Sequence, residues 1–282
     1  MDSQQLLIIY CLLIIAASLT GGFIPVLFKL THRQIQFSLS FVAGILLAVA
    51  LLQLLPHAMI HVEQGSLGVY YALIFGLLVM FLLERFFCFH HHEISTDGTQ
   101  CSHHHNHSEH DLTWTGVVIG LSVHSLFCGM ALAASVAIGE TAGSLEFLAG
   151  FGVFLGIVSH KPFDALTIST LLDKSGYNNK WKVIVNLLFA CVIPFGVLTF
   201  FFSMNLFENN ELYLAYILSF SAGMFLFISL SDLIPELQSH DHDKGLLTFF
   251  FILGIVFIAL SSELEHSSHN HNNLENFEMQ VE

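Results

Sequence analysis

Eight long apolar stretches, separated by short polar segments, dominate the hydrophobic pattern of the chain. A helix needs about 20 mostly apolar residues to cross a bilayer, and these stretches reach or approach that length. Helices satisfy their backbone hydrogen bonds internally, and the stretches are too long and continuous for the alternating strands of an outer-membrane barrel. We therefore predict eight transmembrane helices, at about residues 6–28, 36–59, 67–89, 112–138, 145–172, 181–204, 211–234 and 246–262.

The composition agrees with a membrane location. Of the 282 residues, 54% are hydrophobic and only 11% are charged, whereas a soluble domain carries about 25% charged residues. The 28 phenylalanines are too many for one soluble core. The formal net charge of −14 argues against nucleic acid as a partner, because nucleic-acid binding needs a basic surface. The five cysteines do not form a disulfide framework.

All lysines and arginines except Lys161 fall on one side of the predicted membrane. The segments around the ends of the first, third, fifth and seventh spans contain all of them, namely Lys29, Arg33, Arg85, Lys174, Lys180, Lys182 and Lys244. The positive-inside rule places these segments in the cytoplasm. We therefore expect both termini outside, in a plasma membrane or a bacterial inner membrane. The start lacks the basic region of a secretory signal, so the first apolar run is expected to be a retained span.

Two polar segments lie outside the spans. Residues 90–111 form a histidine-rich connection, expected in the cytoplasm, that would act as a loose scavenger of metal ions; the alternative is a disordered linker. Residues 263–282 form an acidic tail, expected on the extracytoplasmic side. The histidines of the connection are His90, His91, His92, His103, His104, His105, His107 and His110.

An internal repeat links the second and seventh spans. A-G-I-L-L-A-V-A-L-L-Q-L-L-P-H begins at Ala43, and A-G-M-F-L-F-I-S-L-S-D-L-I-P-E begins at Ala222. By the orientation above, the two copies cross the membrane in opposite directions. An inverted repeat is common in secondary transporters, where the working site lies at the repeat interface. We expect two three-helix groups to flank the fourth and fifth spans, a 3+2+3 arrangement.

Polar residues inside the membrane concentrate in the fourth and fifth spans. V-H-S-L-F-C-G-M-A, from Val123, carries His124 and Cys128, and V-S-H-K-P-F-D carries His160 and Asp164. Each pair is spaced i and i+4, which a helix places on one face, and both pairs fall near the bilayer midplane. A lone histidine or cysteine in a span is often a packing residue, but a carboxylate there marks a functional site by default. We predict one shared metal site formed by all four side chains.

The four side chains suit Zn²⁺. Two imidazoles, a thiolate and a carboxylate are a borderline-soft set that can bind tetrahedrally. Cys128 and Asp164 would balance a dication, which matters because uncompensated charge is costly in lipid. The ion is expected as substrate, with no prosthetic group. For Lys161 three alternatives stay open: its ammonium snorkels, it pairs with Asp164 or another acid, or it takes the place of a second ion.

Further polar residues flank the prolines of the repeat. They are Gln53 and His57 in the first copy and Asp232 and Glu236 in the second. These residues either line the entry and exit paths of an ion or lie at helix ends. Asn186, in the sixth span, is a weaker pathway candidate.

These spans and motifs resemble the ZIP family of divalent-metal transporters. Family members carry H-[SN]-x-x-[ED]-G-x-A in the fourth span, and H-S-L-F-C-G-M-A matches except at Cys128, where the family usually has a carboxylate. H-K-P-F-D is similar to a subgroup with H-K and a ligand four residues after the histidine. The resemblance implies an all-α, eight-span membrane protein, in a homodimer, that moves Zn²⁺ or similar ions into the cytoplasm.

The resemblance also implies roles for particular residues. His124, Cys128, His160 and Asp164 map to the primary transport site. Ser125 and Lys161 map to positions that help hold a second metal in binuclear members. The lysine therefore implies one main ion, with its ammonium standing where the second cation would be.

Three other functions stay open from the residues alone. A cation diffusion facilitator exporter also uses H-x-x-x-D pairs, but typically has six spans and a cytosolic C-terminal domain. An intramembrane zinc hydrolase needs an open coordination position and a general base, which four protein ligands would leave no room for unless Cys128 does not ligate. A metal sensor that does not transport would need little beyond the histidine-rich connection.

Overall fold

The computed structural model describes residues 2–27, 31–62, 66–87, 107–141, 149–204, 206, 210–234 and 243–281, and within them the regular structure is entirely helical. Some side chains inside these ranges, including that of Asp232, are not described. The helices are α1 Ser3–Leu27, α2 His32–Ala48, η1 Val49–Leu54, α3 Leu55–Ile60, α4 Gly68–Phe87, α5 His107–Thr141, α6 Phe151–Lys174, α7 Asn179–Ala190, α8 Val192–Met204, α9 Asn210–Phe227, η3 Ile228–Leu233 and α11 Lys244–Val281.

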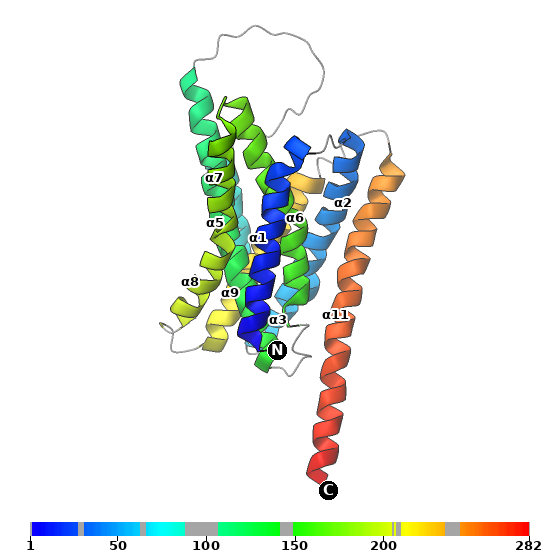
Figure 1. The fold of residues 1–282 in the computed structure, drawn as a ribbon. Helices are drawn as coiled ribbons and strands as arrows, with labels where there is room; N and C mark the ends of the chain where they lie inside the picture. The colour runs from blue at the N-terminus through cyan, green and yellow to red at the C-terminus, as the bar shows by residue number, and fades with distance from the viewer. Residues whose placement is uncertain are drawn as a thin grey trace.

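Successive passes of the chain run in opposite directions, as Figure 1 shows. The two termini lie at the same end of the molecule, and α4 ends and α5 begins at the opposite end. The described chain contains seven helical stretches that are long and apolar enough to span a bilayer. The protein is therefore an all-α, multi-pass membrane protein. The 24-residue α6 is not among the seven, because polar residues lower its mean hydropathy, so a count of eight spans remains a prediction.

The observed helices differ from the predicted spans mainly in two places. α6 begins at Phe151 rather than near residue 145, directly after Gly150, whose φ of 66° is left-handed and belongs to a turn rather than a helix. α11 does not end near residue 262. Its backbone continues as helix to Val281, so the segment expected as a separate acidic tail prolongs the last span beyond the other helices (Figure 1).

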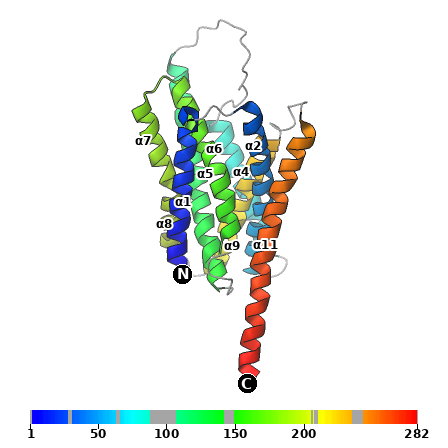
Figure 2. The same cartoon turned by 45° about the vertical axis from the view of Figure 1, so that its right-hand side comes forward.

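The helices form two groups in space. The most extensive pairings are α4 with α9, α2 with α11, α1 with α6 and α5 with α8. In Figure 2 α1, α7 and α8 lie to the left and α2 and α11 to the right. The 3+2+3 order along the sequence stays a prediction, like the count of eight spans. In space, α1 packs against α6 and α8 packs against α5.

Equivalent glycines of the two repeat copies make equivalent close contacts between helices. Gly44 in α2 lies against the backbone carbonyl of Phe251 in α11, and a Cβ there would overlap that oxygen. Gly223, the equivalent residue of the second copy, lies in the same way against the carbonyl of Leu73 in α4. Small residues of this kind let helix backbones approach closely within a membrane. The α2–α11 and α4–α9 pairs are thus built by equivalent contacts.

A matching pair of hydrogen bonds supports the same relation. Ser40, three residues before Ala43, donates to the carbonyl of Leu247 at 2.5 Å. Ser219, three residues before Ala222, donates to the carbonyl of Val69 at 2.5 Å. Both serines are buried. Because α2 and α9 run in opposite directions (Figure 1), the repeat is inverted, as expected.

Both copies of the repeat widen into a π-helix at the same position. η1 covers Val49–Leu54 and η3 covers Ile228–Leu233, each starting at the seventh residue of its copy. In each, the residue after the segment donates its N–H to a carbonyl five residues earlier. Pro56 follows η1 closely; a proline lacks an N–H and crowds the preceding turn, which favours such widening. The two π-segments contain Gln53 and Asp232 at equivalent places.

Candidate metal centre

Three of the four predicted ligands meet at one buried point. The ligand atoms of His124, Cys128 and His160 all lie within 4.8 Å of one another. Nε2 of His124 is 3.5 Å from Nε2 of His160 and 3.2 Å from Sγ of Cys128. His124 and His160 are 1% and 4% exposed. The i, i+4 spacing on α5 and the packing of α5 against α6 produce this convergence.

The fourth predicted ligand, Asp164, lies beside His160 but is not part of this three-residue cluster. Oδ2 of Asp164 is 3.9 Å from Nε2 of His160, one turn along α6. The same oxygen is 3.2 Å from Nζ of Lys161. Asp164 therefore stands between the imidazole and the ammonium, close enough to interact with either.

The orientation of His160 is set by the backbone of its own helix. Nδ1 of His160 lies 2.6 Å from the carbonyl oxygen of Gly156. Since a carbonyl only accepts, Nδ1 carries the proton and Nε2 presents its lone pair to the centre. A hydrogen bond of this kind from the other ring nitrogen is common behind metal-binding histidines.

Lys161 does not snorkel, because its side chain is completely buried. Nζ donates to Oγ of Ser125 and to Oδ2 of Asp164, and it lies 3.8 Å from the ring centroid of Phe189. The structure thus contains the pairing with Asp164 that was one of the alternatives for this lysine, and this pairing is compatible with the ammonium taking the place of a second ion. The ammonium thus occupies a cage made by a hydroxyl, a carboxylate and an aromatic face.

The candidate metal centre is formed by residues that occupy equivalent positions on α5 and α6. His160 follows His124 by 36 residues, and Lys161 follows Ser125 by the same number. The surrounding packing repeats as well. Gly21 of α1 lies against the carbonyl of Pro162, and Gly196 of α8 lies against the carbonyl of Leu126, the residue 36 positions earlier.

Phe225 is a residue of the site that the sequence did not single out. It comes from α9 and is 1% exposed. Its ring centroid lies 6.0 Å from that of His124 and 5.8 Å from that of His160. No local signal distinguishes it among 28 phenylalanines, and only the packing of α9 against α5 brings it to the histidines.

The predicted pathway residues are described in part. Gln53 is 2% exposed, and neither polar atom of its amide has a hydrogen-bond partner within the described chain. Its amide packs against Gly152, in the first turn of α6. Nδ1 of His57 lies 2.7 Å from the backbone oxygen of Gln53. Asn186 instead links helices, donating to Oγ of Ser169 at 2.8 Å and to the backbone oxygen of Lys182 at 3.0 Å.

Other predicted residues fall outside what is described. Only the backbone is described for Asp232 in η3 and for His107 and His110 in α5. Glu236 and the remaining histidines of residues 90–111 lie outside the described residues, namely His90, His91, His92, His103, His104 and His105.

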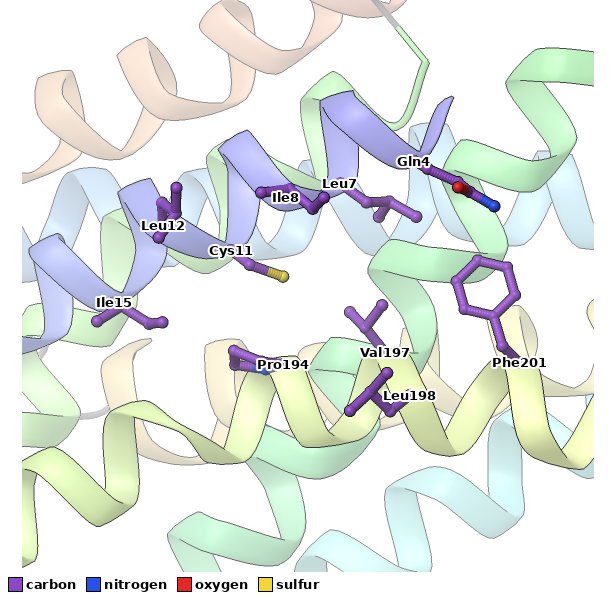
Figure 3. Close-up of a pocket in the computed structure, with 10 residues that line it drawn as sticks. All are labelled: Gln4, Leu7, Ile8, Cys11, Leu12, Ile15, Pro194, Val197, Leu198 and Phe201. Atoms are coloured by element: carbon purple, nitrogen blue, oxygen red, sulfur yellow. The ribbon is translucent and has the colours of Figure 1, made fainter. Parts of the chain in front are cut away.

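A separate groove of about 470 Å³ lies between α1 and α8, away from the metal ligands (Figure 3). Its walls are mostly apolar, and Cys11 and Pro194 face it from the two helices. Cys11 is the single metal-binding type of side chain in this lining, so the groove is not a candidate metal site.

Comparison with known proteins identifies the family of this chain. A family model described as "ZIP Zinc transporter" matches residues 4–117 and 112–262. The chain belongs to the ZIP zinc transporter family. This membership separates it from the cation diffusion facilitators, and a family of transporters gives no support to the hydrolase alternative.

Several curated proteins resemble this ZIP chain. Human zinc transporter ZIP10 is 30% identical over 162 residues, which are 55% of this chain and 18% of that protein. Protein zntC of Dictyostelium discoideum is 26% identical over 122 residues, 42% of this chain and 28% of that protein. Zinc transporter ZupT of Escherichia coli O9:H4 is 41% identical over 71 residues, 25% of this chain and 28% of that protein. The chain spans less than a third of the length of each of these relatives.

Proposed function

We propose that this protein carries Zn²⁺ through the membrane into the cytoplasm, and that the ion binds midway at His124, Cys128, His160 and Asp164. The observation that carries the proposal is the convergence of three buried ligand atoms within 4.8 Å on adjacent helices. Such groups are rare inside membranes and commonly mark ion pathways. Two relatives are themselves named zinc transporters.

The donor chemistry favours a cation of intermediate softness. The lone pair of His160 Nε2 points at His124 Nε2 only 3.5 Å away, an arrangement that a proton or a metal ion between the nitrogens stabilises. The thiol of Cys128 and the carboxylate of Asp164 complete a set of four donors. Imidazole and thiolate together suit Zn²⁺ better than the hard, oxygen-seeking ions.

One ion, rather than two, occupies the site. The Lys161 ammonium sits beside Ser125 and Asp164, where it contributes the positive charge that a second cation would bring. A dication next to a buried ammonium would be repelled strongly at low dielectric.

The ion reaches and leaves the site along the two copies of the repeat. Gln53 and His57 lie on the extracytoplasmic side, and Asp232 and Glu236 on the cytoplasmic side, by the positive-inside orientation. The unpartnered amide of Gln53 offers an oxygen to a passing ion. Both Gln53 and Asp232 belong to π-segments, which occur frequently at functional sites. Asn186 is a weaker contributor because it lies on α7, outside both copies of the repeat, and its amide nitrogen already links it to Ser169 and Lys182.

The proposal also covers the oligomeric state, the membrane and the orientation of the protein. The protein works as a homodimer in a plasma membrane or bacterial inner membrane, with both termini outside. The histidines of residues 90–111 collect released ions in the cytoplasm. The two termini lie at one end of the molecule, which supports a common side for both (Figure 1).

Uptake by lipid vesicles containing the purified protein and a trapped zinc-sensitive dye tests the proposal. Wild type should show saturable Zn²⁺ entry, and Asp164→Ala should abolish it. Asp173→Ala is the matched control, because this carboxylate lies at the end of the same helix and pairs with Lys182 instead. Zn²⁺ flux that survives the loss of both Asp164 and His160 would show that the transport site lies elsewhere.

A further inference from the structure

Phe225 packs against both histidines of the candidate metal centre from a third helix. The ligands come from α5 and α6, whereas Phe225 comes from α9, in the other group of helices. Its ring lies at 59° to that of His124 and 75° to that of His160, so it contacts the two imidazoles in tilted and edge-on arrangements. Such arrangements are the favourable geometry for aromatic pairs.

We infer that Phe225 determines metal specificity by keeping water out of the coordination shell; this inference rests on the function proposed above. A tetrahedral Zn²⁺ site is complete with four protein donors. Ions such as Mn²⁺ and Mg²⁺ favour six oxygen ligands and usually keep several waters. A water ligand beside His124 and His160 would need the space that the phenyl ring fills.

The ring also offers no polar group to such a water. A buried water is stable only where two to four polar partners surround it. The hydrocarbon edge of Phe225 supplies none, and at 1% exposure the side chain has no neighbouring solvent to share. Coordination numbers above four are therefore disfavoured both by space and by lost hydrogen bonds.

Phe227 provides a matched control on the same helix. It is 8% exposed and packs in a different cluster with Met80, Phe220 and Met224. Its ring stacks edge-on against Phe81, with centroids 6.2 Å apart, on the face toward α4. Truncation of Phe227 should remove a buried phenyl ring from the same helix without opening the candidate metal centre, because no aromatic contact joins Phe227 to His124 or His160 within the described chain.

Two measurements on wild type, Phe225→Ala and Phe227→Ala test the inference. The first is the visible absorption of Co²⁺ bound to the purified protein, which is intense in tetrahedral sites, intermediate in five-coordinate sites and weak in six-coordinate ones. Phe225→Ala should lower this absorption several-fold. The second is the ratio of Mn²⁺ to Zn²⁺ uptake by vesicles, which should rise by roughly tenfold, a common size for discrimination by pocket shape.

The outcomes separate the two proposals. An unchanged Co²⁺ spectrum and an unchanged uptake ratio in Phe225→Ala, or equal changes in Phe227→Ala, would overturn the role of Phe225. Phe225→Leu gives a second variant if Phe225→Ala does not fold, and its shorter side chain should move both measurements in the same direction. Absence of Zn²⁺ uptake by wild type would refute the transport proposal, while the Co²⁺ spectra would still decide the role of the ring.

Discussion

At the scale of single residues, the proposed metal site departs from the family motif at Cys128. Sγ of Cys128 lies 3.2 Å from Nε2 of His124, within the reach of a shared ion. Replacing the soft sulfur by a carboxylate in Cys128→Glu should shift preference toward harder ions such as Mn²⁺ and Fe²⁺. Competition of each ion against Zn²⁺ uptake measures the shift. An unchanged order of preference would mean that the thiol does not ligate.

A second prediction concerns the buried ammonium. Lys161→Met removes the cation that balances Asp164, and breaking a buried pair on one side costs about 3 kcal/mol or more. The melting temperature in detergent should therefore fall without metal. Zn²⁺ should restore it by more than it stabilises wild type, because the ion then neutralises Asp164 without facing an ammonium. Equal stabilisation of both proteins by Zn²⁺ would contradict this account of Lys161.

At the scale of elements, we expect the close packing of α2 against α11 to contribute to the stability of the fold. Gly44 touches the backbone of α11, and the larger side chain in Gly44→Val would force α2 and α11 apart. Overpacking of this kind typically costs about 1–3 kcal/mol. The midpoint of unfolding in a denaturing detergent should fall accordingly. Gly245→Val is the control, since nothing lies within 4 Å of a Cβ at that position in the first turn of α11, and it should cost much less.

Features that depend on residues close together in the sequence could be predicted from it, whereas features that depend on contacts between distant helices could not. The spans and the i, i+4 pairs His124/Cys128 and His160/Asp164 are readable because apolar runs and helix periodicity are local. The cage around Lys161 and the cover provided by Phe225 are not, because they depend on which distant helices pack together. The π-segments could be predicted only in part. The repeat, with its prolines and equivalent polar residues, is apparent in the sequence, but the widening of the helix into a π-helix is not.

The inverted repeat gives the whole molecule its central site. Equivalent contacts join α2 to α11 and α4 to α9, and equivalent residues of α5 and α6 face each other at the metal centre. The two halves differ chemically where they meet, because Cys128 and Ser125 on α5 correspond to Asp164 and Lys161 on α6. The site is therefore symmetric in backbone but not in side-chain chemistry, because α5 supplies a thiol and a hydroxyl where α6 supplies a carboxylate and an ammonium.

The direction of transport depends on the orientation of the whole molecule. Single cysteines placed at two exposed positions, Asp2→Cys before α1 and Asn179→Cys at the start of α7, report the two ends in a background whose native cysteines are replaced by alanine. A membrane-impermeant maleimide should label position 2 in intact cells and position 179 only after permeabilisation, because the segments rich in Lys stay in the cytoplasm. The reverse pattern would place the basic segments outside, and Asp232 and Glu236 would then lie at the entrance rather than the exit.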